Sequence, residues 1–247
     1  MENNIILSTY FTSKIDYQRC KHQSNDDYQY IKDWYESIIS LQLKGIIFHD
    51  NLSDNFVRKY QNKNIKFIKV KVGNLSLNDE RFFIYLNFLK ENIFDYVLMT
   101  DISDVVFNKN PFLIINDKYD LYIGSEPWNF QHKDWILERY RIIYGKEPLE
   151  YYDNIVLNAG IIGGKYLNIM ELLKKYTSEM KSLSSKRGKQ IDKINKKRKI
   201  EKISFNMIVL NKVIYANYNM DKVYTAKLLH NPFKSYFRDR KYFIFHK

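Results

Sequence analysis

The stretch DERFFIYLNFLKENIFDYVLMTDISD, residues 79–104, contains one complete unit of the fold. Its first part, residues 79–92, predicts a helix, and the apolar run Phe94–Met99 has the length and composition of a buried strand. Two acids, Asp101 and Asp104, follow the end of that strand. A helix that leads into a buried strand with a polar exit is typical of an α/β sheet with parallel pairing.

The same alternation continues on both sides of this unit. Short apolar runs that end in polar residues predict further strands at 4–12, 45–50, 65–70 and 120–126. Apolar positions at helical spacing predict helices at 30–43, 167–180 and 204–211, with an aromatic, helix-like stretch that ends at Tyr144. Gly160–Gly164 is expected to be a tight segment with a turn at its end. We therefore expect a single α/β domain with a mixed, mainly parallel sheet flanked by helices over residues 1–247.

The charge of the chain is concentrated in one tract. The net charge is +12, and residues 186–202 hold nine basic and two acidic residues, a net +7. Such a tract is either a patch for phosphates, nucleic acid or an anionic membrane surface, or a solvated helix or loop. An apolar fraction of 45% excludes wholesale disorder. The single cysteine, Cys20, excludes a disulfide scaffold, and no apolar run is long enough to span a membrane, so we expect a cytoplasmic protein without a signal peptide.

The acids Asp101 and Asp104 are the first candidates for chemistry. Two carboxylates in a sharp connection between buried segments are costly unless they are paired or bind a metal. Oxygen ligands of this kind suit Mg²⁺ or Mn²⁺. The spacing alone is equally compatible with an Asx-turn, in which one aspartate caps the following turn.

The run YVLMTDISDVVFNKNPF, residues 96–112, resembles the metal-binding segment of GT-A glycosyltransferases, in a microbial or viral branch with the form T-D-x-x-D-V-x-F. Further segments are similar to motifs of that branch and follow in the same order: DLYIGSE at 120–126, NAGIIGG at 158–164, SFNMIVLN at 204–211 and LLHN at 228–231. The resemblance covers residues 3–236. It implies a GT-A fold, with a nucleotide-binding half at about 1–110 and a sugar and acceptor half at about 111–247.

The resemblance also implies a metal site and a nucleotide site. Asp104 would bind the ion directly, Asp101 would bind the ion or the nucleotide ribose, and His230 would be the third ligand. An imidazole suits Mn²⁺ better than Mg²⁺, so Mn²⁺ (or Mg²⁺) is the expected cofactor. The residues expected at the nucleotide are Thr9, Tyr10, Phe11, Asp50, Arg81, Asp101 and Lys234, with Tyr10 a candidate for stacking on the base and Lys234 and Arg238 for the diphosphate. Asp50 has an equally good interpretation as a helix N-cap.

The sugar and the acceptor would bind in the second half of the chain. Asn158, Ala159 and Gly160 are expected at the sugar, and Glu126 and Asp153 are candidates for the base that deprotonates the acceptor hydroxyl. Asn206 stands where the family usually has an acid or Gln, which weakens a catalytic role there. Trp128 and Trp135 are either core residues or a platform for an acceptor sugar.

These features together predict a metal-dependent glycosyltransferase that moves a hexosyl or pentosyl unit from a nucleotide-diphosphate donor, UDP-sugar by default, to a hydroxyl of a glycan or glycoconjugate. The basic tract would allow peripheral contact with an anionic membrane. The alternative is a basic nucleic-acid-binding protein without catalysis, supported by the charge and by the aromatic content of 16%. Nucleic acid is the less expected partner, because the basic residues cluster in one tract without a recognisable binding motif.

Overall fold

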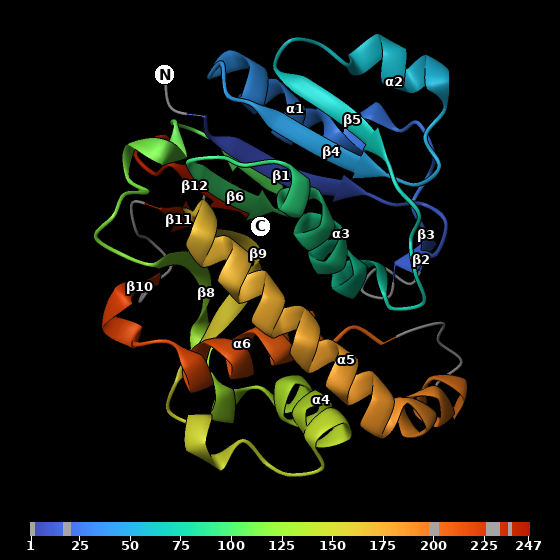
Figure 1. The fold of residues 1–247 in the computed structure, drawn as a ribbon, viewed down its shortest axis with the longest axis vertical. Coiled ribbons are helices and arrows are strands. Elements are labelled where there is room, and N and C mark those ends of the chain that lie inside the picture. Colours follow the sequence, from blue (N-terminus) through green and yellow to red (C-terminus); the bar gives the residue numbers. More distant parts are fainter. Residues whose placement is uncertain (1–2, 17–20, 198–202, 226–232, 237–238) are drawn as a thin grey trace.

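The computed structural model describes residues 3–16, 21–197, 203–225, 233–236 and 239–247 (Figure 1). The helices are α1 (Tyr28–Ser40), α2 (Asp54–Tyr60), α3 (Leu77–Glu91), α4 (Asp134–Tyr144), α5 (Tyr166–Lys197) and α6 (Asn206–Asn217). The longer strands are β1 (Ile5–Tyr10), β4 (Gly45–His49), β5 (Ile65–Lys69), β6 (Tyr96–Thr100), β8 (Leu121–Asn129) and β9 (Ile155–Lys165). The short strands are β2 (Ile15–Asp16), β3 (Lys21–His22), β7 (Val105–Phe107), β10 (Val223–Thr225), β11 (Lys234–Ser235) and β12 (Ile244–His246).

The central sheet of the described chain has seven strands in the order β10-β8-β9-β6-β1-β4-β5. β1 pairs in parallel with β4 and β6, and β4 pairs in parallel with β5. β9 is antiparallel to both of its neighbours, β6 and β8. The start of β9 therefore lies at the same edge of the sheet as the carboxyl ends of the other strands, which is where ligands gather in sheets of this kind.

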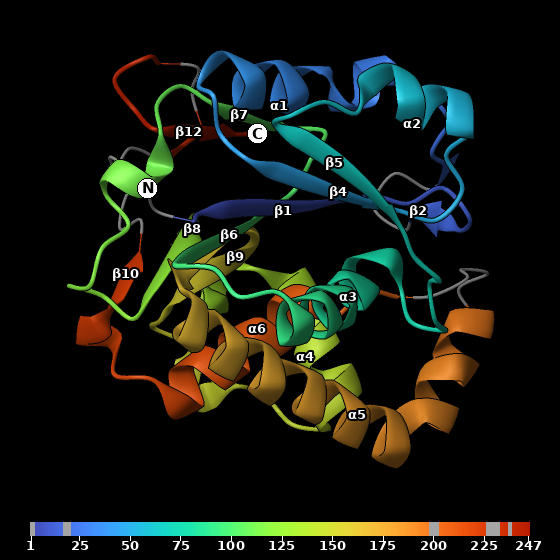
Figure 2. The same ribbon diagram turned by 45° about the horizontal axis from the view of Figure 1, so that its top comes forward.

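The two faces of the sheet carry different layers (Figure 2). α3, α4, α5 and α6 lie on one face, while α1, α2 and a small second sheet lie on the other. The second sheet has the order β11-β12-β7, so the last strand, β12, pairs directly with the strand that follows the two acids. Each face has its own apolar core, one around Phe82 and Tyr176 and the other around Trp34 and Phe107.

The expected α/β class and the mainly parallel, helix-flanked sheet are confirmed. The expectation for Gly160–Gly164 was wrong, because these residues lie inside the extended strand β9, where Gly163 pairs with Leu98 and Gly164 with Val97. The helix expected at 167–180 is longer and runs on into the basic tract as far as Lys197. Residues 198–202 of the tract lie outside the described residues.

Asp50 does not cap a helix, because the N-cap of α2 is Ser53, whose hydroxyl accepts the N–H of Phe56. The carboxylate of Asp50 instead accepts the N–H groups of Thr12 and Ser13 and so holds the loop after β1. Among the helices of the described ranges, none has both the length and the apolar character that crossing a membrane requires.

Candidate metal centre

The loop after β6 holds the two acids at the carboxyl edge of the sheet. The Asp101 N–H donates to the Gly160 carbonyl at 2.9 Å, which ties the loop to β9. Arg81, on the second turn of α3, forms an ion pair with Asp101 Oδ1 and donates from Nη2 to the Ala159 carbonyl at 2.8 Å. The guanidinium is buried, at 5% exposure. One Asp101 oxygen is thus engaged by Arg81, and the other, Oδ2, faces His246.

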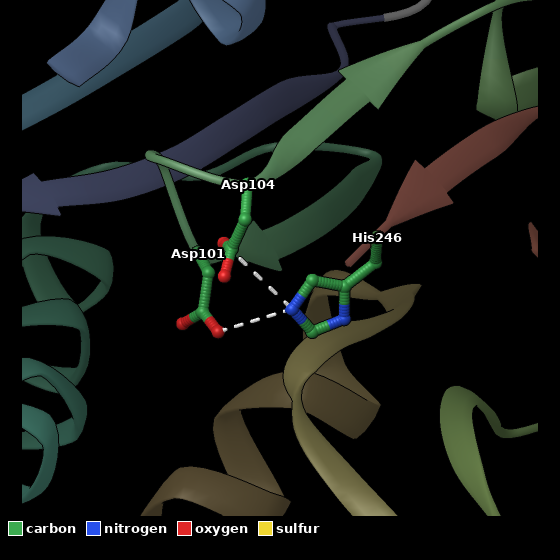
Figure 3. A group of neighbouring side chains, drawn as sticks. All are labelled: Asp101, Asp104 and His246. Atoms are coloured by element: carbon green, nitrogen blue, oxygen red, sulfur yellow. Dashed lines mark ion pairs between the residues drawn. The ribbon is translucent and has the colours of Figure 1, made fainter. Parts of the chain in front are cut away.

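The third member of the group comes from the last strand. β12 is antiparallel to β7 with His246 paired to Val105, one residue after Asp104. His246 Nε2 lies 3.3 Å from Asp101 Oδ2 and 3.8 Å from Asp104 Oδ1 (Figure 3). The Lys247 N–H donates to the Asp104 carbonyl at 3.1 Å, so the end of β12 is attached to the acid loop by backbone as well as by side chains.

The three side chains fit a divalent ion. One ligand atom from each of Asp101, Asp104 and His246 can be chosen so that all lie within 4.8 Å of one another, and Figure 3 shows the two carboxylates turned toward the imidazole. Two carboxylate oxygens and one imidazole suit Mn²⁺ and also accept Mg²⁺. The Nδ1 atom of His246 is buried and has no hydrogen-bond partner within the described ranges.

The charge of the site is set mainly by the buried pair. Burial by itself would raise the pKa of Asp101, but Arg81 and His246 outweigh burial and hold that pKa far below its ordinary value. Burial would lower the pKa of Arg81, and Asp101 raises it instead. Both groups are therefore charged at neutral pH, and Asp101 is available as an anionic ligand.

A cavity of about 270 Å³ opens beside the three side chains. Its lining comes from the end of β1, the starts of α1, α3, α4 and α6, the acid loop, the end of β8, the middle of β9 and the end of β12. The residues are Thr9, Tyr30, Asn78, Arg81, Asp101, Ile102, Ser103, Asp104, Glu126, Trp128, Trp135, Asn158, Ala159, Gly160, Asn206, Met207, His246 and Lys247. The cavity is thus assembled from segments of both halves of the chain.

Three residues expected at a nucleotide, Thr9, Arg81 and Asp101, line this cavity. Tyr10 does not; its ring is fully buried, and its hydroxyl donates to the Ser24 carbonyl. Phe11 and Asp50 also lie outside the lining.

The expected sugar-site residues form one hydrogen-bonded group on the cavity wall. Asn158 donates from Nδ2 to Glu126 Oε1, and its Oδ1 accepts the Gly160 N–H at 2.7 Å. Asn206 lies at the start of α6, where its Oδ1 accepts the Met207 N–H at 2.8 Å. Of the two acids considered as a base, only Glu126 lines the cavity, because Asp153 is exposed and bonded to Gln131.

Lys234 is buried and does not line the cavity. It is 1% exposed, and its Nζ is 2.8 Å from the Tyr236 hydroxyl, which in turn donates to the Ser125 carbonyl. Burial lowers the pKa of Lys234 to about 8, against the opposing attraction of Glu126, Asp101 and Asp104. The lysine is therefore a buried countercharge to the acids in this structure. His230 and Arg238 lie outside the described residues.

Two functional candidates were missed by sequence reasoning. His246 has no recognisable motif around it, and only the pairing of β12 with β7 brings it to the acids. Tyr30 lines the cavity and lies with its ring centroid 4.8 Å from that of Tyr10. Tyr30 could have been suspected because it lies at the start of the first helix. An aromatic residue at such a position is, however, equally typical of core packing.

In comparisons with known proteins, no family model and no curated protein matches this sequence.

Proposed function

We propose that the protein is a metal-dependent glycosyltransferase of the GT-A type that uses a nucleotide-diphosphate sugar. The observation that carries the proposal is the Asp101, Asp104 and His246 group at the mouth of a cavity at the carboxyl edge of a mainly parallel sheet. A divalent ion held there would neutralise a diphosphate and stabilise the charge that develops on it as the leaving group.

The residues around the group support a division of the cavity. Thr9 and Tyr30 come from the end of β1 and from α1, and they provide a polar group and a half-buried ring for a nucleoside. Asn158, Ala159 and Gly160 lie next to the acids on β9 and provide amide and backbone groups for sugar hydroxyls. Asp101 is linked to this second part through Arg81, which donates to the Ala159 carbonyl.

Glu126 is the group best placed to accept a proton from an acceptor hydroxyl. It lines the cavity and is oriented by the Asn158 side chain, which is itself fixed by the Gly160 N–H. A base must lie within hydrogen-bond reach of the proton it removes, and the place of Glu126 in the cavity lining would allow an acceptor hydroxyl to approach it.

The test is calorimetric titration of UDP, GDP and dTDP, each with Mn²⁺ and with EDTA, into the wild-type protein and Asp104→Ala. We expect one nucleotide to bind with a requirement for both the metal and Asp104. Leu113→Ala is the matched control, since Leu113 is 73% exposed and lies outside the cavity lining. If none of the three nucleotides binds in a metal-dependent way, the proposed mechanism is wrong, and binding of nucleic acid becomes the next hypothesis to measure.

A further inference from the structure

The chain has three tryptophans, which differ in burial. Trp34 is fully buried on α1, and its indole N–H donates to the Thr100 hydroxyl at 2.9 Å. Trp128, near the end of β8, and Trp135, on the first turn of α4, are only partly buried and both line the cavity. Trp34 is thus a satisfied core residue, whereas the other two form part of a surface that a ligand would contact.

Trp128 has a donor that the protein leaves unused. Its Nε1 atom is buried and, in the part of the chain that the structure describes, has no hydrogen-bond partner. This atom has almost no accessible surface, so a bound molecule would contact the ring of Trp128 rather than its N–H.

Both rings are held in place by cations that are not part of the cavity lining. The Lys133 ammonium lies 3.8 Å from the centroid of the Trp128 ring, and the Arg139 guanidinium lies 4.8 Å from the centroid of the Trp135 ring. Arg139 also donates to the Ser204 carbonyl, just before α6. Rings fixed in this way lose little freedom when a ligand binds, which favours affinity.

The polar groups beside the two rings are of the kind that bind hydroxyls. Glu126 lies two residues before Trp128 in the same strand, and Asn158 donates to its carboxylate. Asn206 and Met207, at the start of α6, complete this wall. A cation covers one face of each ring, and the wall offers the remaining ring surface together with carboxylate and amide groups, while the metal group lies on the acid loop and β12.

We propose that Trp128 and Trp135 form the acceptor subsite and that the acceptor is a pyranose unit of a glycan, stacked on these rings with a hydroxyl directed at Glu126. This inference rests on the proposed glycosyl transfer. In that transfer the acceptor oxygen forms a bond to the anomeric carbon of the donor sugar, and the bond from that carbon to the diphosphate oxygen breaks. The electron pair leaves with the nucleoside diphosphate, and the acceptor proton passes to Glu126.

The test uses an array of immobilised glycans that end in hexoses, N-acetylhexosamines, deoxyhexoses, pentoses or sialic acids. Fluorescently labelled protein is applied with UDP and Mn²⁺. We expect binding to pyranose-terminated glycans of one class, and a loss of about twofold to tenfold in affinity for Trp128→Ala and for Trp135→Ala, which corresponds to an aromatic contact of about 0.5–1.5 kcal/mol. Trp135→Phe, which keeps a ring, should retain most of the binding.

Two controls separate this inference from the proposed function and from misfolding. Leu167→Ala removes an apolar side chain that is 73% exposed on α5 and should bind glycans as the wild type does. The tryptophan variants should retain the wild-type circular dichroism spectrum and metal-dependent UDP binding. The inference is overturned if the wild type binds no glycan on the array while it binds UDP, or if both alanine variants bind glycans as tightly as the wild type.

Discussion

Replacing Arg81 with Met should make the protein easier to unfold, because it removes the partner of a carboxylate that the fold has partly removed from water. The Arg81 side chain is 6% exposed and that of Asp101 is 33% exposed. Removing one partner of a fully buried pair costs about 3–5 kcal/mol. The partial exposure of Asp101 and the nearby His246 reduce this to about 2 kcal/mol, and the unpaired Ala159 carbonyl adds about 1 kcal/mol.

The expected loss in the free energy of unfolding for Arg81→Met is therefore about 3 kcal/mol, measured by urea denaturation at pH 7. Arg141→Met is the matched control, because Arg141 pairs with Glu147 on the surface with its side chain 52% exposed. Exposed pairs contribute at most about 1 kcal/mol.

The pH dependence provides a second readout. A carboxyl whose folded pKa is depressed adds stability above its unfolded pKa of about 3.9, and this stability is lost as the pH falls through the folded value. Asp101 has such a depressed pKa, so the wild type should lose stability in acid more steeply than Arg81→Met. The reasoning is refuted if Arg81→Met costs no more than Arg141→Met at pH 7.

Two further predictions concern the site wall and the support beneath it. Gly160→Ala should abolish metal affinity with the fold intact, because its Cβ would collide with Asp101 Oδ2 and His246 Cε1; unchanged Mn²⁺ binding in a titration would contradict this. Asp79 accepts the Phe205 N–H at 3.2 Å, and burial raises its pKa to about 6. The folded state then holds the proton more tightly than the unfolded state. The free energy of unfolding should therefore fall by about 3 kcal/mol as the pH rises from 4 to 6, and it should stay level at higher pH. In Asp79→Asn that fall should disappear from denaturation curves; an unchanged fall would assign it to other groups.

Much of the fold was predictable because it depends on local patterns. The strands β4, β5 and β6 are short apolar runs with polar exits, and the start of α3 has a serine cap, Ser76, whose hydroxyl accepts the Asp79 N–H. The spacing of apolar residues and the identity of helix caps depend on residues close together in the chain, so both can be recognised in one sequence. The direction of β9 was not predictable, because its glycines suggest a turn when their neighbours in the sheet are unknown.

The candidate metal site was predictable only for the two acids that lie close together in the chain. Asp101 and Asp104 follow the same strand and are three positions apart, so the sequence alone places them close together. His246 reaches them through β12, whose pairing with β7 joins residues more than 130 positions apart. Similarly, the stacking ring was expected at Tyr10 because that residue ends β1, but alternation along the strand points its side chain into the core and leaves Tyr30 at the cavity.

The most direct test of the metal site is electron paramagnetic resonance of bound Mn²⁺, with detection of nitrogen coupling from a ligating imidazole. The wild type should bind Mn²⁺ with such a coupling, His246→Gln should lose the coupling, and Asp104→Asn should lose most of the binding. His230→Gln, at the histidine that the sequence motif suggests, should keep the wild-type spectrum. Nitrogen coupling that persists in His246→Gln and vanishes in His230→Gln, or an absence of Mn²⁺ binding to the wild type, would contradict the site described here.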